Sequence, residues 1–343
     1  MVELAHIFRW DLDKTYLRTD FETLRGLVRS AFEKAEQKQA VPGASALLRE
    51  LRASGSHRIC FISGSPRQMR KVLEQKLKLD GVQFDEFILK PNVSNLLRGR
   101  FRALREQVGY KLPALLAGRL AVNRPVPETL FGDDAEGDAF IYSLYADIVR
   151  GAVNKTMVAQ VFERVGTYPD VAARTLALID GIELSDVVRR IFIILDKRSP
   201  PARFDRYGAR VVPIYNYFQA AAVLYQDRVL DAPALVRVAL DMVGRASYEV
   251  SALASSFQDL VRRGRLSRAS THRLGAELDG AAALAGGDGV VSLVTALGHR
   301  VRALGSARAQ PAATLAEQVD YLAALAEDPP RLLKPPGAGK KKK

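Results

Sequence analysis

Two aspartates two residues apart, Asp11 and Asp13, follow a mostly apolar segment that begins at Ala5. Side chains alternate between the faces of a strand, so residues at i and i+2 share a face. Two like charges held close are costly unless a cation or a proton lies between them, and Mg²⁺ takes oxygen ligands. The pair therefore predicts a Mg²⁺ site, and residues further along the chain strengthen that prediction.

Three further groups of polar residues follow along the chain: Ser63 with Gly64, then Lys111, then the acidic set Asp133, Asp134 and Asp138. All except the lysine come directly after apolar segments that predict strands. Ligands of open α/β sheets bind beyond the carboxyl ends of the strands. We therefore expect the aspartates, the serine and the acidic set to meet at one edge of a sheet.

The residue types suit phosphoryl transfer. A carboxylate can attack phosphorus to form an aspartyl phosphate, and a second carboxylate can protonate the leaving oxygen and later deprotonate a water. A serine hydroxyl and the backbone N–H groups after it can hold phosphate oxygens at a helix N-terminus. A lysine offsets the negative charge, and further carboxylates complete an all-oxygen Mg²⁺ shell.

Strands and helices alternate over the first two hundred residues. The predicted strands cover 5–10, 58–62, 86–89, 128–131 and 191–195, and the first predicted helices cover 21–37, 42–53 and 66–79. Short, continuously apolar strands separated by helices are typical of a parallel sheet with helices on both faces. The sequence therefore predicts an α/β fold.

The chain is predicted to divide into two parts and a tail. We expect an α/β domain over 1–230 with a helical insertion at about 152–189, an all-helical bundle over 231–330 and a disordered basic tail over 331–343. The bundle rests on four Ala- and Leu-rich segments with helical spacing: 235–261, 270–284, 290–304 and 312–325. The tail rests on a Pro- and Gly-rich segment that precedes four terminal lysines.

Composition narrows the function further. The 343 residues are 48% hydrophobic and 26% charged, as in soluble globular proteins, and no apolar run reaches the ~18–20 residues of a transmembrane segment. The single cysteine, Cys60, excludes an internal disulfide and predicts a reducing, cytoplasmic location. The formal charge of +13 favours a phosphorylated substrate, an anionic membrane surface or a nucleic acid, with a solvated basic surface as the alternative.

The order of these groups resembles the haloacid dehalogenase (HAD) superfamily of phosphohydrolases. Within it, the segments 41–43, 61–66 and 132–142 resemble the catalytic domain of the App1-like phosphatidate phosphatases, and the resemblance extends over about residues 1–225. It implies a HAD-like (Rossmannoid) sheet and Mg²⁺-dependent hydrolysis of a phosphomonoester through an aspartyl phosphate.

The same resemblance implies roles for individual residues. The catalytic residues would be the nucleophile Asp11, the general acid/base Asp13, the phosphoryl-binding Ser63 and the charge-balancing Lys111. Substrate would also contact Gly64 and Arg67. The Mg²⁺ ligands would be Asp11, the backbone carbonyl of Asp13, and Asp133 with Asp138 or Asp134.

Several of these roles have competing interpretations. Lys90, which ends its own predicted strand, is the other candidate for the catalytic lysine. Ser63 could serve only as a helix N-cap, and Asp134 could be solvated. Arg67 and Arg70 flank the predicted phosphate loop, where they form either substrate clamps or a solvated face.

The connections after the first two predicted strands are too short for a full cap domain, so we expect an open site. Such a site suits a bulky substrate such as phosphatidate, with peripheral contact to an anionic membrane. Two other functions stay open: a catalytically silent HAD-like binding module and a nucleic-acid end phosphatase. The complete acidic set argues against the first function. The sequence has neither a P-loop motif nor aromatic-rich basic strands, which argues against a nucleic-acid substrate.

Overall fold

The computed structural model describes residues 3–18, 34–90, 103–122, 124–284 and 316–327, with residues 295, 296, 298, 299 and 303. Most of each of the predicted helices over 290–304 and 21–37 lies outside the described residues, as does the whole predicted tail over 331–343.

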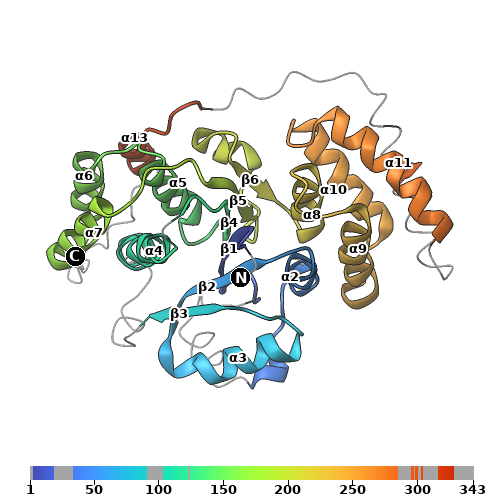
Figure 1. Cartoon of the computed structure of the whole chain (residues 1–343), viewed down its shortest axis with the longest axis horizontal. Coiled ribbons are helices and arrows are strands. Elements are labelled where there is room, and N and C mark those ends of the chain that lie inside the picture. The colour runs from blue at the N-terminus through green and yellow to red at the C-terminus, as the bar shows by residue number, and fades with distance from the viewer. Residues whose placement is uncertain are drawn as a thin grey trace, which may run out of the picture.

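A six-stranded parallel sheet forms the centre of the molecule, in the spatial order β3-β2-β1-β4-β5-β6 (Figure 1). Its strands are β1 (His6–Asp11), β2 (His57–Pro66), β3 (Glu86–Lys90), β4 (Glu128–Asp133), β5 (Val188–Ile194) and β6 (Val211–Ile214). The chain adds strands to one side of β1 and then to the other, so β1 lies between β2 and β4. This arrangement confirms the predicted α/β fold with a parallel sheet.

The sixth strand, β6, was absent from the sequence-based prediction. It has only four residues, one of which is Pro213, and it pairs with β5 at the edge of the sheet. Proline cannot donate a ladder hydrogen bond, which weakens the strand pattern but is tolerated at an edge. Its four residues are all buried, because α8 (Tyr217–Gln226) packs against it.

Helices cover both faces of the sheet and divide the apolar core into two main clusters. The first cluster joins the sheet to α2 (Ala44–Ala53), α3 (Arg70–Leu79), α8, α9 (Ala232–Ala246), α10 (Val250–Arg262) and α11 (Arg268–Leu284). The second joins it to α4 (Ala103–Leu120), α5 (Asp138–Val149), α6 (Lys155–Val165), α7 (Pro169–Asp180) and α13 (Tyr321–Glu327). Three short 3₁₀ helices complete the described elements: η1 (Ala35–Gln37), η2 (Arg67–Met69) and η5 (Pro201–Tyr207).

The C-terminal helices lie on two different faces. Helices α9, α10 and α11 extend the layer formed by α2 and α8, whereas α13 packs against α6. The Tyr321 hydroxyl of α13 donates a 2.6 Å hydrogen bond to Asp147 of α5, and its ring meets Phe140 edge-on. Helical periodicity shows that a helix has an apolar side but not which part of the protein covers it. The domain boundaries near 230 and 330 stay a prediction.

Within the part of the chain that the structure describes, none of the helices combines the length and the apolar character that crossing a bilayer needs.

Candidate active site

The carboxyl ends of three adjacent strands bring the predicted site residues together. Asp11 ends β1 beside Ile62 of β2, while Trp10 pairs with Phe131 of β4. The rings of Trp10 and Phe131 stack with centroids 3.8 Å apart and are fully or almost fully buried, so they join β1 to β4 one residue before Asp11. After β1 the chain adds β2 and β3 on one side and then β4, β5 and β6 on the other, so the strand order reverses at β1. Ligands of open α/β sheets bind at such a switch point.

Helix α4 supplies the positive charge. Nζ of Lys111 lies 2.9 Å from Oδ1 of Asp11 and 2.5 Å from Oδ1 of Asp138, and all three side chains are fully buried. Of the two lysines that the sequence left in competition, Lys111 is the one that the structure pairs with Asp11; Lys90 ends β3. Burial opposes a charged ammonium, but the two carboxylates outweigh it and raise the pKa of Lys111 well above its usual range.

Asp13 is held by two serine hydroxyls. Ser63 and Ser65 donate to the same oxygen, Oδ2 of Asp13, at 3.0 and 2.8 Å, and the Ser65 backbone N–H donates to Oγ of Ser63. Burial raises the pKa of Asp13, and the two hydroxyl hydrogen bonds oppose that rise. A carboxyl with a raised pKa that is fixed by neighbouring hydroxyls suits a general acid/base.

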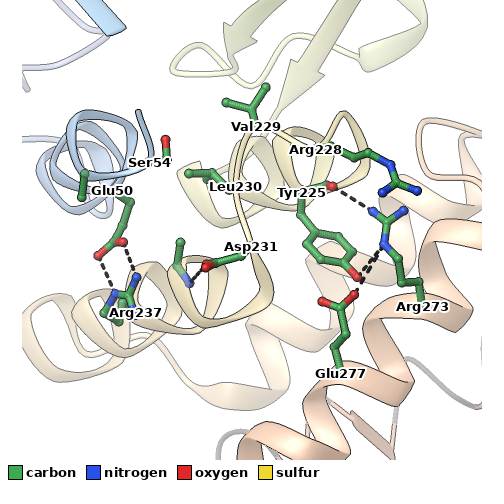
Figure 2. Close-up of a pocket in the computed structure, with 12 residues that line it drawn as sticks. Glu50, Ser54, Tyr225, Arg228, Val229, Leu230, Asp231, Arg237, Arg273 and Glu277 are labelled. Carbon is green, nitrogen blue, oxygen red and sulfur yellow. Dashed lines mark hydrogen bonds and ion pairs between the residues drawn. The ribbon is translucent and has the colours of Figure 1, made fainter. Parts of the chain in front are cut away.

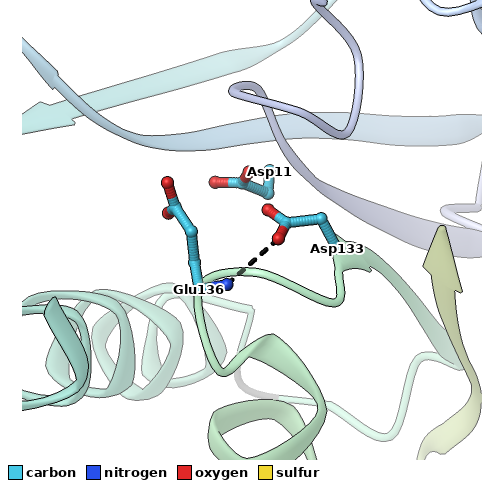
Figure 3. A group of neighbouring side chains, drawn as sticks. All are labelled: Asp11, Asp133 and Glu136. Atoms are coloured by element: carbon cyan, nitrogen blue, oxygen red, sulfur yellow. Dashed lines mark hydrogen bonds between the residues drawn. The ribbon is translucent and has the colours of Figure 1, made fainter. Parts of the chain in front are cut away.

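Asp11, Asp133 and Glu136 form a compact acidic group (Figure 3). Each offers a carboxylate oxygen, and these oxygens lie within 4.8 Å of one another. The loop after β4 fixes Asp133, whose Oδ1 accepts hydrogen bonds from the backbone N–H groups of Ala135 and Glu136. The other oxygens, Oδ2 of Asp11 and Oδ2 of Asp133, are buried without a hydrogen-bond partner.

This donor set fits a hard divalent cation. Burial is the largest cause that raises the pKa of each of the three carboxyls in the group, and repulsion from neighbouring carboxylates adds to it. Buried anionic oxygens without donors are costly, and a cation bound by oxygen ligands removes that cost. The residues present therefore fit Mg²⁺, which prefers few carboxylates together with water and phosphate oxygens.

The two other predicted metal ligands have different partners. Asp138 accepts from Lys111 and from the backbone N–H of Asp133, so it links the lysine to the acidic group. Asp134 points to the neighbouring loop, where its carboxylate accepts from the backbone N–H groups of Lys197 and Ser199. The structure thus places Asp138 next to the acidic group, whereas Asp134 binds the backbone of the loop after β5.

The predicted substrate-binding residues lie around the end of β2. Gly64 faces the side chain of Gln107, since a Cβ at Gly64 would lie 3.3 Å from its Nε2. Arg67 is exposed on η2. Arg70, by contrast, donates to Glu74 and to the backbone carbonyl of Phe87, so its guanidinium is engaged within the fold.

Three residues of this site were missed by sequence reasoning: Ser65, Gln107 and Glu136. Ser65 shares the face of Ser63 at i+2 on β2, and the Ser-Gly-Ser spacing was the available signal. Gln107 precedes Lys111 by one helical turn, so the two side chains share a face of α4. Its Nε2 donates a 2.6 Å hydrogen bond to Glu136, whose loop position no periodicity could place.

A cavity of about 520 Å³ lies elsewhere, between α2, α8, α9 and α11 (Figure 2). Two of its acidic residues have partners: Arg237 binds both carboxylate oxygens of Glu50, and Asp231 accepts from the backbone N–H of Ala234 in the first turn of α9. Arg273 donates to the hydroxyl and the backbone carbonyl of Tyr225. The cavity therefore resembles a solvated groove with balanced charges rather than a catalytic centre.

Comparison with known proteins agrees with the geometry. Residues 10–160 match the family described as phosphatidate phosphatase APP1, catalytic domain. This segment runs from the end of β1 to within α6 and contains every residue that the site description names from β1, β2, α4 and β4. The match confirms, over these residues, the resemblance to the catalytic domain of the App1-like phosphatidate phosphatases. No curated protein and no solved structure matches the chain.

Proposed function

We propose that this protein is a Mg²⁺-dependent phosphomonoester hydrolase of the HAD type, acting on phosphatidate or another phosphomonoester with a bulky carrier. The observation that carries the proposal is the buried Oδ2 of Asp11, which has no hydrogen-bond partner and lies beside Lys111 and the acidic group. The family match supports a phosphatase of the phosphatidate class.

Asp11 is the nucleophile in this proposal. One of its carboxylate oxygens attacks phosphorus, the bond from phosphorus to the ester oxygen breaks, and protonated Asp13 gives its proton to the departing oxygen. A water then attacks the aspartyl phosphate, Asp13 takes a proton from that water, and inorganic phosphate leaves with Asp11 restored. The raised pKa of Asp13 supports its holding a proton at the first step.

Lys111 and the serines orient the reacting groups. The ammonium of Lys111 offsets the charge of Asp11 without leaving its second partner, Asp138. Ser63 and Ser65 fix Asp13 through its Oδ2, so the acid/base stays on the side of β1 next to β2. Asp11 and Asp133 would hold Mg²⁺, which when bound offsets negative charge on the carboxylates and on the phosphoryl oxygens.

The basic residues near the site support an anionic, bulky substrate. Lys14 directly follows Asp13 with a left-handed backbone (φ 59°), and Arg67 is exposed next to the β2 end. Helices α6 and α7, which lie in the segment of the predicted insertion, pack against each other, and α7 also packs against α4. Each exposed cation near an anionic surface contributes about 1 kcal/mol to its attraction, and salt screens that attraction over about 8–10 Å. We propose peripheral contact with anionic membranes on this basis.

A phosphatase assay tests the activity. The full chain should hydrolyse an aryl phosphate with Mg²⁺ and lose that activity in excess EDTA, and Asp11→Asn should abolish turnover while circular dichroism shows an intact fold. An exposed matched variant, Asp170→Asn on α7, should retain full activity. Equal rates with EDTA would exclude the metal, and near wild-type turnover by Asp11→Asn would exclude the aspartyl phosphate.

A substrate panel tests the specificity. We expect kcat/KM for dispersed phosphatidate to exceed that for sugar phosphates and nucleotides, and binding to anionic vesicles to weaken as salt is added. A sugar phosphate or nucleotide preferred by more than about tenfold, or about 1.4 kcal/mol, would refute the bulky-substrate proposal. Preference for a terminal phosphate on nucleic acid would instead support an end-processing phosphatase.

A further inference from the structure

Glu136 lies in the loop between β4 and α5 and is the most exposed member of the acidic group. Its side chain is 17% exposed, whereas Asp11 and Asp133 are fully buried. Figure 3 shows its carboxylate extending from the loop toward those of Asp11 and Asp133. Glu136 is thus the solvent-facing member of the acidic group, and Asp11 and Asp133 are its buried members.

The charges around Glu136 are not balanced by the lysine. Nζ of Lys111 is 3.6 Å from Oε2 of Glu136, further than from either Asp11 or Asp138. The Lys111 ammonium lies within ion-pair distance of three carboxylates, those of Asp11, Asp138 and Glu136, and Asp133 adds a fourth negative charge. The charge of Lys14 also acts on Glu136. Like charges at such distances repel strongly in a buried site, so a second cation would stabilise the arrangement.

The surrounding contacts hold Glu136 in place. Its backbone N–H donates to Oδ1 of Asp133, so the loop that fixes one carboxylate also fixes the position of the other. Nε2 of Gln107 donates a 2.6 Å hydrogen bond to Oε2 of Glu136. One hydrogen bond to the side chain of Glu136 and one from its backbone, next to the unpartnered Oδ2 atoms of Asp11 and Asp133, indicate a prepared ligand rather than a chance approach.

We propose that Glu136 is a third carboxylate ligand of the divalent cation, beside Asp11 and Asp133, and that Gln107 is its positioning residue. This inference rests on the proposed function, because it concerns the same site. A third anionic oxygen increases the affinity for a divalent cation.

The test measures metal binding directly, without turnover. Full-length wild type and Glu136→Gln, both freed of metal, are titrated with Mg²⁺ by calorimetry and with Mn²⁺ by electron paramagnetic resonance. We expect Kd to rise at least tenfold in Glu136→Gln. Glu163→Gln, which removes an exposed charge from α6, should change Kd less than twofold.

Further variants separate ligation from charge alone. Glu136→Asp keeps the negative charge but shortens the side chain. If Glu136 is a ligand, this variant should have a higher Kd for the cation, whereas a purely electrostatic role predicts an unchanged Kd. Gln107→Leu should weaken binding by a smaller factor, because it removes only the positioning hydrogen bond. If Glu136→Gln does not fold, Glu136→Asp decides the question.

The outcomes also separate this inference from the proposed function. If wild type binds Mg²⁺ and hydrolyses phosphate while Glu136→Gln binds within twofold of it, the role of Glu136 is refuted and the proposed function stands. If wild type binds no divalent cation, both are refuted.

Discussion

Replacing Lys111 by methionine gives the sharpest test of how the site is built. Methionine has a similar length and fills the same space, but it lacks the ammonium that contacts Asp11 at 2.9 Å and Asp138 at 2.5 Å. All three side chains are fully buried, so neither carboxylate can turn to water. The variant therefore removes a charge with little change in packing and leaves two buried anions without their cation.

The expected loss follows from burial. Breaking a buried ion pair by removing one partner costs about 3–5 kcal/mol of the free energy of unfolding. For a domain of about 200 residues, this is a fall in Tm of roughly 6–20 °C, since each kcal/mol corresponds to about 2–4 °C.

The loss should depend on pH in a defined direction. Burial raises the pKa of Asp11 and Lys111 lowers it, so the variant should raise that pKa further. A carboxyl whose pKa is higher in the folded than in the unfolded state binds protons more readily when folded. The ionised carboxyl of Asp11 therefore lowers the stability of the variant at high pH, and this stability is recovered as the pH falls through the folded-state pKa of Asp11.

Urea unfolding in EDTA, at about pH 8 and about pH 5.5, measures both effects. The difference between wild type and Lys111→Met should be near the full value at the higher pH and clearly smaller at the lower one. A loss below about 1 kcal/mol, or an equal loss at both pH values, would refute the assignment of Lys111 as the cation of a buried acidic site.

Three further variants test other parts of the structure. Asp13→Asn should lower kcat about 10²–10⁴-fold, because it removes proton transfer, with little change in Tm; unchanged kcat would exclude Asp13 as the acid/base. Gly132→Ala should cost about 1–3 kcal/mol in urea unfolding, because a Cβ there would overlap the Asp138 side chain, and an unchanged midpoint would contradict that packing. Burial lowers the pKa of His6 to about 4, so the unfolded state takes up a proton at a higher pH than the folded state does. The free energy of unfolding should therefore fall by about 3 kcal/mol in all as the pH falls from about 6.5 to 4. In His6→Gln this fall should be smaller than in wild type.

Sequence patterns were sufficient for the fold and for the groups at the strand ends. Five of the six strands consist of apolar runs long enough to recognise, and a parallel sheet necessarily gathers their carboxyl ends at one edge. Asp11, Ser63 and Asp133 follow those runs directly, which is why they could be expected to meet. The family match supports the same residues as part of one catalytic segment, and their individual roles stay predictions.

Side-chain partners could not be derived from the same patterns. The sequence favoured Lys111 but left Lys90 as its rival, and the folded position of α4 places Lys111 between Asp11 and Asp138. Asp134 and Glu136 belong to one short loop, yet Asp134 holds the backbone after β5 and Glu136 faces the acidic group. A loop has no periodicity that determines which way its side chains point, so the backbone hydrogen bonds of the folded loop decide it.

The sequence by itself determined the parallel sheet, the edge at which the site forms and the carboxylate chemistry, because apolar periodicity and residue type act locally. The tertiary structure decided which lysine balances the site, which acidic residues form one group and which sheet face each C-terminal helix covers. Those choices depend on contacts between residues far apart in the chain, such as Gln107 with Glu136 and Tyr321 with Asp147. Both contacts lie on the face of the sheet that α4, α5 and α13 cover, and they form only when these helices pack against it.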